Sequence, residues 1–232
     1  MNQFKRIQLL LNDEQFNKLH TTHVMVFGMG GVGSFVCEAL IRSGIGQISL
    51  VDHDDVEITN LNRQLIATHQ TLGTKKVESM KERLLSINPE AKINIYPIFY
   101  NEDSNISLDG VDYVVDAIDS VPSKISLMAQ CEKAGVPMIM ACGTGNKMNP
   151  LDLRVSQLYK TDMDPLAKKL RTLAKARGLK SVKVVYSIEA PQVTLQEKGT
   201  YEKVIIGSMV FVPGSAGLLI ASEVIKDVLK MV

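Results

Sequence analysis

The stretch Gly28-Met29-Gly30-Gly31-Val32-Gly33 decides the fold of this chain, because it joins an apolar run to a helical pattern. Residues 23–27 before it are predicted to form a strand, and residues 34–43 after it a helix. Glycines in such a loop let the backbone approach phosphate oxygens at the N-terminus of the helix. The loop alone is a weak signal, because a tight turn without a ligand has the same pattern. It predicts a strand–helix unit and leaves the chemistry open.

Strand and helix patterns alternate over residues 23–142, which predicts a parallel sheet with crossover helices. The other expected strands are residues 47–52, 93–99, 112–119 and 137–142. A helix over residues 74–87 should stop at Asn88-Pro89, and another should open at Pro122 and close at Gly135. The fold class expected here is therefore α/β, with a Rossmann-like, mostly parallel sheet.

The pattern changes after residue 150, where Leu151, Leu153 and Val155 alternate with polar residues. This alternation is typical of a half-exposed antiparallel strand, so antiparallel strands should continue the sheet. Asp164-Pro165 is a good helix start. The chain is expected to be one domain, residues 1–232, with an excursion at about residues 160–200.

Positive charge is concentrated in that excursion, although the formal net charge of the chain is only +1. Eight Lys and Arg residues and two Asp residues lie between positions 160 and 183, so this segment carries +6 and the rest −5. We expect Leu166, Leu170 and Leu173 to form the narrow apolar stripe of a helix that Gly178 ends. The basic side chains expected to cover its other faces are Lys168, Lys169, Arg171, Lys175 and Arg177. Such a surface suits an anionic partner, although an ordinary solvated helix would have the same pattern.

An uncharged run over residues 204–221 has 18 positions, close to the lower limit for a membrane span. Gly207, Gly214 and Gly217 interrupt it. We therefore expect a buried strand, a turn and a packed helix from about Pro213 to Lys230, in the core or in a dimer interface. Peripheral membrane contact is the less favoured interpretation.

The three cysteines, Cys37, Cys131 and Cys142, lie far apart and form no CxxC pair. This spacing argues against a disulfide framework and against a four-cysteine zinc site. The N-terminal residues do not have the pattern of a secretory signal. A reducing, cytoplasmic setting fits both features best. Cys37 and Cys131 are expected to pack inside crossover helices, whereas Cys142 ends a strand near the candidate site.

Polar residues after the second strand separate two kinds of nucleotide site. Asp52 ends that strand where a carboxylate can accept hydrogen bonds from ribose hydroxyls, a placement that NAD sites share. Asn60, Arg63 and Gln64 follow at the rim where ligands bind in open α/β sheets. Arg63 can hold a phosphate through paired hydrogen bonds. Lys76 lies in a first helical turn, where the helix dipole disfavours a cation, so an anionic ligand would explain it. These donors favour a triphosphate over a dinucleotide.

Two carboxylates end a further strand at the same rim, Asp116 and Asp119. Either of them could hold Mg²⁺ on the β- and γ-phosphates, or serve only as a capping or loop residue. His53 next to Asp52 is expected to line the pocket.

Taken in order, the motifs GxGGxG, DxDxVExTNLNRQ, Gly73 with Lys76, and DAIDS resemble the ubiquitin-activating-enzyme superfamily over about residues 6–145. Its members adenylate a carboxylate with ATP and Mg²⁺. The resemblance implies that Asp52 binds the ribose and that Asp119 binds the metal. It also implies that Arg6 reaches across a dimer interface to the partner's ATP. The residues it places against the nucleotide are Gly28, Gly30, Gly31, Gly33, Asp52, Asp54, Asn60, Arg63, Gln64, Lys76 and Asp119. The residues with an implied catalytic role are Arg63, Lys76, Asp119 and Arg6.

The second half of the chain bears on which carboxylate is activated. Sulfur-carrier adenylating enzymes usually have paired CxxC motifs, and ubiquitin activators add a catalytic-cysteine domain; neither is found here. Residues 164–171, 184–191 and 211–222 instead resemble the bacterial tRNA threonylcarbamoyladenosine dehydratases. This resemblance implies an ATP-dependent homodimer that adenylates threonylcarbamoyladenosine beside the anticodon and cyclises it with release of AMP. The basic segment at about residues 160–200 would then face the tRNA, with Tyr159 and Tyr186 as candidates for base stacking.

Three other functions remain open from the sequence. The nearest is an adenylyltransferase that activates the C-terminal carboxylate of a small sulfur-carrier protein. A nucleotide-binding scaffold without activity is another, and an NAD-dependent oxidoreductase would leave Arg63 and Lys76 unexplained. Some relatives are linked with a cysteine desulfurase system, which makes such a system a further candidate partner.

Overall fold

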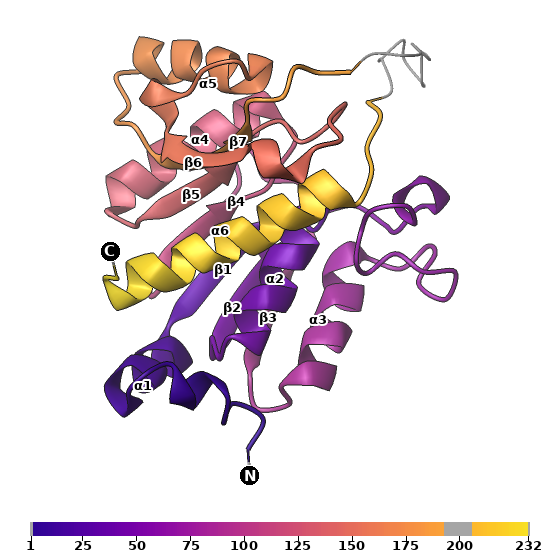
Figure 1. Cartoon of the computed structure of the whole chain (residues 1–232), viewed down its shortest axis with the longest axis vertical. Helices are drawn as coiled ribbons and strands as arrows, with labels where there is room; N and C mark the ends of the chain where they lie inside the picture. The colour runs from indigo at the N-terminus through magenta and orange to yellow at the C-terminus, as the bar shows by residue number, and fades with distance from the viewer. Residues whose placement is uncertain (1, 193–205, 232) are drawn as a thin grey trace.

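A central seven-stranded sheet organises the part of the chain that the computed structural model describes, residues 2–192 and 206–231 (Figure 1). Its strand order is β3-β2-β1-β4-β5-β7-β6. The strands are β1 (His23–Phe27), β2 (Gln47–Val51), β3 (Lys92–Tyr96), β4 (Tyr113–Asp116), β5 (Met138–Ala141), β6 (Leu153–Gln157) and β7 (Lys183–Ser187). The helices are α1 (Asp13–Thr21), α2 (Gly33–Arg42), α3 (Lys76–Ile87), α4 (Val121–Ala134), α5 (Pro165–Ala176) and α6 (Phe211–Leu229). Short 3₁₀ turns are η1 (Ile7–Leu9), η2 (Ile58–Asn60), η3 (Pro150–Asp152) and η4 (Leu158–Lys160).

All neighbouring strands of the sheet run parallel except β6, which pairs antiparallel with β7 at one edge. The expected Rossmann-like sheet with an antiparallel continuation is thus confirmed. The chain leaves β1 towards β2 on one side and returns to β4 on the other side. This reversal of the strand order opens a crevice at the carboxyl ends of the strands, the usual ligand position in such sheets.

Helices cover both faces of the sheet, and the alternating side chains of β1 show how the two cores form. Val24 and Val26 belong to the cluster under α2, α3 and α6, whereas Met25 and Phe27 belong to the cluster under α4 and α5. Strand β1 is buried on both faces and therefore reads as a continuous apolar run, as expected of a parallel strand.

Helix ends lie close to where the sequence signals place them. Asp164 caps α5 through a hydrogen bond from the backbone N–H of Ala167 to its carboxylate. Gly135 and Gly178 both adopt positive φ angles after α4 and α5, the conformation that glycine adopts without strain. Helix α3 ends at Ile87, directly before Asn88-Pro89. The expected strand 93–99 is shorter, because the chain leaves the sheet after Tyr96.

The C-terminal segment differs from the expectation. Residues 206–210 form no strand, and α6 begins at Phe211, two residues before the expected start; residues 204 and 205 lie outside the described residues. Its glycines serve close packing, because a Cβ on Gly217 would lie 2.6 Å from the Val32 carbonyl oxygen of the loop before α2. A Cβ on Gly214 would meet the Phe35 ring. Among the described residues, no helix is long and apolar enough to cross a membrane.

Helix α5 also buries a different stripe from the expected one. Ala167, Leu170 and Ala174 are fully buried, whereas Leu173 is 37% exposed. Alanine has the smallest apolar side chain, so it lets α5 approach the layer that includes α4 closely. The buried face of α5 is thus rotated about the helix axis from the face that its three leucines predict.

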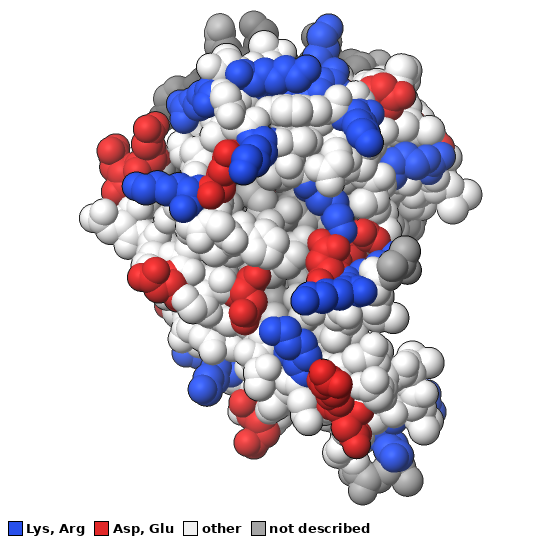
Figure 2. Space-filling model, turned by 90° about the vertical axis from the view of Figure 1, so that its left-hand side faces the viewer, with Lys and Arg blue, Asp and Glu red and all other residues white. Residues whose placement is uncertain are grey.

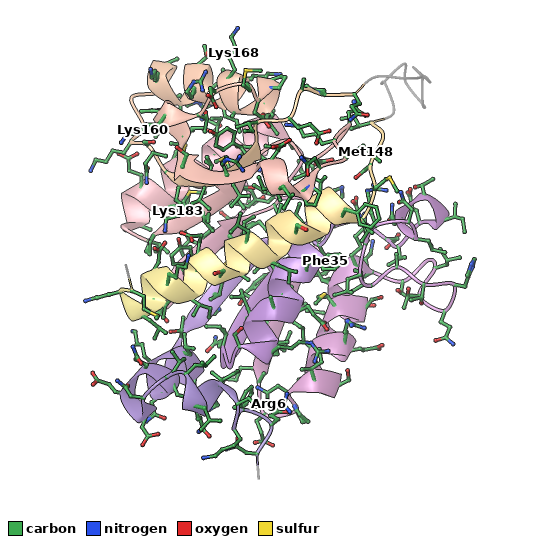
Figure 3. The ribbon with its side chains drawn as sticks, viewed as in Figure 1. Arg6, Phe35, Met148, Lys160, Lys168 and Lys183 are labelled. Carbon is green, nitrogen blue, oxygen red and sulfur yellow. The ribbon has the colours of Figure 1, made fainter. Side chains whose placement is uncertain are left out.

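Basic side chains gather at the end of the molecule that α5 forms (Figure 2). Lys168 and Lys169 are exposed and form no hydrogen bond or ion pair through their side chains within the described ranges. Lys168 points outward at this end, whereas Arg6 lies at the opposite end near α1 (Figure 3). The arginine Arg171 is an exception to the expected surface, because its guanidinium donates to the hydroxyl and carbonyl of Thr161.

Other members of the predicted tRNA-facing set also have partners inside the protein. Lys175 lies over the ring of Tyr159, 5.2 Å from its centroid. Arg177 is 4.0 Å from Glu102, a loose and exposed pair. Tyr186 is buried and donates a hydrogen bond to Asp162, so the suggestion that it stacks on a base is wrong.

Candidate nucleotide-binding site

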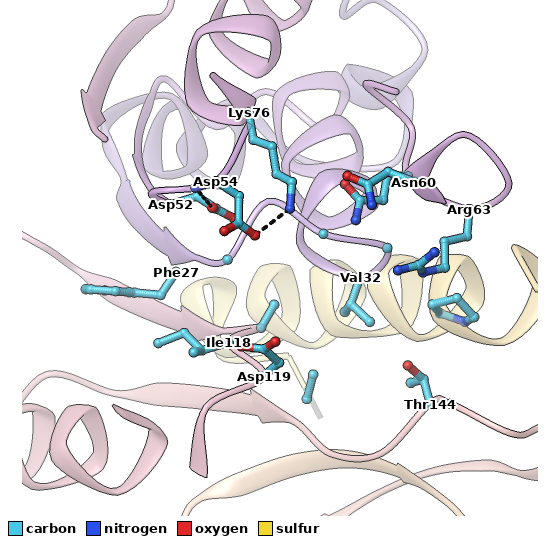
Figure 4. Close-up of a pocket in the computed structure, with 18 of the residues that line it drawn as sticks. Phe27, Val32, Asp52, Asp54, Asn60, Arg63, Lys76, Ile118, Asp119 and Thr144 are labelled. Carbon is cyan, nitrogen blue, oxygen red and sulfur yellow. Dashed lines mark hydrogen bonds and ion pairs between the residues drawn. The ribbon is translucent and has the colours of Figure 1, made fainter. Parts of the chain in front are cut away.

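A cavity of about 460 Å³ opens at the carboxyl ends of β1, β2, β4 and β5 (Figure 4). This volume lies within the usual range for small-molecule sites. The cavity brings together nearly all residues that the sequence analysis placed against a nucleotide: Gly28, Gly30, Gly31, Asp52, Asp54, Asn60, Arg63, Gln64, Lys76 and Asp119. Gly33 and Arg6 are not in its lining.

The glycine loop divides into residues that the fold requires and residues that face the cavity. Gly28 has a φ of +92°, and a Cβ there would lie 2.5 Å from the carbonyl oxygen of Ala117. A Cβ on Gly33 would lie 1.7 Å from the carbonyl oxygen of Gly28. Around Gly30 there is more space, since a Cβ would meet only Gln64 Nε2 at 3.9 Å. The backbone at Gly30 is therefore open to a ligand, while Gly33 keeps the loop closed behind it.

Asp52 ties the end of β2 to the glycine loop. Its carboxylate accepts the backbone N–H of Met29 at 2.6 Å and that of Asp54 at 2.8 Å. A carboxylate has about four acceptor positions, so two remain for hydroxyl groups of a ligand. The side chain is held in place and can still bind a ribose.

Lys76 is almost fully buried, with 6% of its surface exposed. Its ammonium group lies 2.7 Å from Asp54 Oδ2, shown as a dashed line in Figure 4. The other oxygen of Asp54 lies 3.2 Å from His53 Nε2. The lysine therefore has an anionic partner in spite of its position in the first turn of α3, and it presents its charge to the cavity. Asp54 is half exposed, so a phosphate could approach the same ammonium group.

Asn60, Arg63 and Gln64 form the rim of the cavity beside the glycine loop. Arg63 donates Nη1 to the Thr59 carbonyl and to Asn62, which fixes its guanidinium and leaves further N–H groups free to point into the cavity. Asn60 accepts the backbone N–H of Glu57 with its side-chain oxygen, and its amide N–H₂ group donates a hydrogen bond to the Thr59 hydroxyl at 3.4 Å, which leaves its second N–H for a ligand. The buried Oε1 of Gln64 has no hydrogen-bond partner in the structure. These groups supply donors at a site that already has a buried cation.

Asp116 and Asp119 have separate positions, although both follow from the DAIDS sequence. Asp116 is completely buried, and its Oδ1 accepts hydrogen bonds from Lys124 Nζ and from the backbone N–H of Ile118, both at 3.0 Å. Burial raises the pKa of Asp116, and the Lys124 ammonium opposes this effect. Lys124 also donates to the Ala141 carbonyl at 2.8 Å. Asp116 does not line the cavity, and Lys124 pairs with its Oδ1 while its buried Oδ2 has no hydrogen-bond partner, so Asp116 is a poorer candidate for a metal ligand than Asp119.

Asp119 is exposed at the cavity and forms no hydrogen bond or ion pair through its carboxylate with the described residues. It is therefore the carboxylate of this motif that is free to bind a ligand or a cation. Lys124 was missed in the sequence, since a lysine in a helix usually lies in solvent; its position eight residues after Asp116 was the available signal.

The thiol of Cys142 lines the cavity but is 5% exposed. Burial raises the pKa of this thiol to about 12, so it is protonated at neutral pH and is a weak nucleophile. Cys37 and Cys131 are buried in α2 and α4, as expected. None of the three is in a reactive environment.

His53 lines the cavity, as expected, whereas Phe99 and the opposite wall were not predicted from the sequence. Next to Asp52, the rings of His53 and Phe99 meet edge to face with centroids 4.9 Å apart, an apolar surface suited to a base. On the other side, Gly143, Thr144 and Leu166 form a wall from the loop after β5 and the first turn of α5. Thr144 lies across the cavity from Asn60 and Lys76 (Figure 4).

Comparison with known proteins places this geometry in a family. The model of the ThiF family matches residues 3–231. A relative from Bacillus subtilis (strain 168) named tRNA threonylcarbamoyladenosine dehydratase is 42% identical over 243 residues, covering 99% of this chain and 96% of the relative. A relative with the same name from Escherichia coli (strain K12) is 42% identical over 72% of this chain and 66% of its own length. The crystal structure of the E. coli tRNA N6-threonylcarbamoyladenosine dehydratase in complex with ATP matches with a TM-score of 0.89 and 34% identity, over 98% of this chain and 94% of that one.

Proposed function

Because this chain belongs to the ThiF family, we propose that its cavity binds ATP and that it is an ATP-dependent dehydratase of tRNA. The proposed substrate is threonylcarbamoyladenosine in tRNA, as the name of the B. subtilis relative suggests, and its position next to the anticodon is what the family resemblance implies. The observation that carries this proposal is the full-length similarity to that relative, combined with a cavity that gathers Asp52, Arg63 and Lys76 at the glycine loop.

The reaction needs an adenylated carboxylate and then a ring closure. A carboxylate oxygen of the substrate attacks the α-phosphorus of ATP, and pyrophosphate leaves. A nucleophile on the same side chain then attacks the acyl carbon, and AMP leaves with the carboxylate oxygen. Ring closure is intramolecular, so proximity supplies much of its acceleration and no enzyme nucleophile is required. A protonated Cys142 is consistent with this route.

The residues of the cavity would stabilise the charge that develops on the phosphates. In the proposal, Asp52 binds the ribose, and Lys76, Arg63 and Asn60 bind the phosphates with oriented donors. Gly28, Gly30 and Gly31 let the backbone approach the same oxygens, with Gly33 closing the loop behind them. Gln64 and Asp54 complete the site, because Gln64 lines the cavity with its Nε2 beside Gly30 and Asp54 orients Lys76.

Mg²⁺ fits the donor set at Asp119, because an exposed carboxylate with no partner among the described residues is the oxygen ligand that this ion prefers. Asp119 would hold the ion, which would neutralise charge on the β- and γ-phosphates. The cluster of Asp52, His53 and Asp54 is a poorer choice, since backbone N–H groups and Lys76 already engage both carboxylates.

The basic end of the molecule is the proposed contact for the anticodon arm. Lys168 and Lys169 are the best candidates for phosphate contacts, because they are exposed and have no partner in the described residues. Lys175 and Arg177 can add charge at the edge. Arg171 is better explained as a structural residue that anchors α5 to Thr161.

A homodimer is part of the proposal, and residues 1–232 act in it as one adenylating domain. Large apolar side chains are exposed on α6 and the adjacent turn η3, with Phe211 at 51%, Leu218 at 53% and Leu151 at 81%. A second copy would cover such a surface. Arg6 lies far from its own cavity, so an action on nucleotide would have to occur in the partner subunit.

A reducing setting such as the cytoplasm fits the three free cysteines. A cysteine desulfurase would need an accessible thiol to receive sulfur. All three thiols are buried, so such a partner is not part of the proposal.

The proposal is tested by measuring AMP and pyrophosphate with purified protein and ATP. Turnover is expected with tRNA that carries threonylcarbamoyladenosine and not with unmodified tRNA. Turnover with a small carrier protein that ends in diglycine, and none with either tRNA, would favour the sulfur-carrier adenylyltransferase instead.

A further inference from the structure

A second buried ion pair lies behind the wall of the cavity that contains Thr144. Lys147 Nζ is 3.4 Å from Asp164 Oδ2 and donates a hydrogen bond to the Ser187 carbonyl at 3.0 Å. Lys147 is 3% exposed and Asp164 is 2% exposed. Neither residue lines the cavity, so the reaction described above gives this pair no role.

The carboxylate of Asp164 joins three parts of the fold. Its Oδ1 caps α5 by accepting the backbone N–H of Ala167 at 2.8 Å. Its Oδ2 binds Lys147, which belongs to the loop after β5. The backbone of Gly143 in the same loop rests against it, because a Cβ there would lie 3.2 Å from Oδ2. A single side chain therefore fixes the start of the basic helix relative to the cavity wall.

Stability alone is a weak reason for burying this pair. Removing two charges from water costs free energy, and the attraction between the buried charges often fails to compensate for this cost. A well-packed apolar pair of similar volume would often make the protein equally or more stable. A helix cap needs only one oxygen, and serine or asparagine would supply it. The link between the cap and the loop is what the charged pair adds.

Helix α5 leads away from the cavity along its basic face. Leu166 in its first turn lines the cavity. Lys168 and Lys169 follow within one turn, about 3 Å and about 4.5 Å further along the axis at about 1.5 Å per residue. If the phosphates of single-stranded RNA contact these two lysines, a neighbouring nucleotide of the RNA is within reach of the cavity wall that contains Thr144.

We propose that the wall formed by Gly143, Thr144 and Leu166 holds the nucleoside that accepts AMP, and that the Lys147–Asp164 pair positions this wall relative to the basic helix. Lys147 and Asp164 are positioning residues, since they act through the loop and through α5. This inference rests on the proposed function for the identity of the nucleoside. To that function it adds the side of the cavity from which the RNA enters and the two residues that position the wall that the RNA contacts.

The test compares Asp164→Asn with Asn12→Ala. Asparagine keeps an oxygen for the cap and removes the charge that binds Lys147, whereas Asn12 caps α1, remote from the cavity, through the backbone N–H of Gln15. We expect Asp164→Asn to raise the KM for modified tRNA, and the equilibrium Kd for tRNA, by about 10-fold, while the Kd for ATP changes less than about 2-fold. Asn12→Ala should change none of these constants, although it lowers the melting temperature.

The result that would overturn the inference is an Asp164→Asn protein whose tRNA affinity equals that of the wild type, or whose ATP and tRNA affinities fall equally. If Asp164→Asn does not fold, the double variant Lys147→Met/Asp164→Asn removes both buried charges and is judged by the same two outcomes. The proposed function is judged separately. Wild-type protein without turnover on modified tRNA would refute that function, whereas tRNA binding to the wild type and the variant would still decide the positioning role.

Discussion

Replacing Lys76 by methionine should slow catalysis by about 10²- to 10³-fold while leaving the fold nearly intact. Its ammonium group is the buried cation of the cavity, 2.7 Å from Asp54. Loss of one charge contact to a transition state typically costs about 10²- to 10³-fold in kcat, or about 2.7–4 kcal/mol. Asp54 is half exposed, so losing its partner should cost at most about 1 kcal/mol of unfolding free energy. For a domain of this size that corresponds to a melting temperature lower by about 2–4 °C.

Lys75→Met is the matched control for this variant. Lys75 is the neighbouring lysine and also pairs with an aspartate at 2.7 Å, Asp55, but it is more exposed and does not line the cavity. The assay is pyrophosphate release with modified tRNA, with the melting temperature of both variants measured in parallel. Equal activity of Lys76→Met and Lys75→Met would refute the phosphate-binding role of Lys76. A large drop in melting temperature for Lys76→Met alone would show that its role is structural.

Three further predictions concern the loop, the basic helix and acid stability. Gly33→Ala should abolish ATP binding, measured by calorimetry, because its Cβ would lie 1.7 Å from the Gly28 carbonyl oxygen; wild-type affinity would refute the close approach. Replacing Lys168 and Lys169 together by alanine should weaken tRNA binding and reduce the slope of log K against log salt by about 1.4–1.8; an unchanged slope would show that both lysines are merely solvated. Glu38→Gln should lower the melting temperature at pH 7, and should lower it by less at a pH below the ordinary carboxyl pKa of about 4.3. A loss of equal size at both values would contradict the ion-pair role of Glu38.

The sign of the last prediction follows from the contacts of Glu38. Burial pushes the pKa of its carboxyl up, but hydrogen bonds from Arg83 and Arg42 outweigh this and hold the pKa below its ordinary value. A lowered pKa in the folded state means that the contribution to stability is fully present above the unfolded value of about 4.3. This contribution to stability is lost as the pH falls through the pKa of the folded protein.

The control for the replacement of Lys168 and Lys169 is the double variant Lys18→Ala/Lys92→Ala. Both of these lysines are exposed and lie on α1 and β3, at the ends away from the cavity.

Much of the fold could be predicted because local signals and the global fold agree. The glycine loop, the caps at Asp164 and Gly135, and the apolar strands each act within a few residues of where the structure has them. Residues of the site could be predicted for the same reason, since strand ends of a parallel sheet meet at one edge. Asp52 and Lys76 are 24 positions apart and face the same cavity.

The expectations that differ from the structure have a common physical cause. They depend on packing between residues that are far apart in the sequence, which local patterns do not show. A buried strand was expected before α6, whereas residues 206–210 form none and α6 begins at Phe211, with Gly217 packed against the loop before α2. Tyr186 was expected to be accessible because it adjoins a basic segment. It lies in β7, between β5 and the edge strand β6, and is buried. The pairing of Lys147 with Asp164 joins segments 17 positions apart through a loop whose path the sequence does not show.

The central claim is a dehydration of tRNA driven by ATP, and one measurement tests it directly. The tRNA is incubated with protein and ATP, digested to nucleosides and analysed by mass spectrometry. The account predicts that threonylcarbamoyladenosine loses one water, with one AMP and one pyrophosphate formed for each cyclised nucleoside. An unchanged nucleoside in the presence of protein that binds ATP would contradict it.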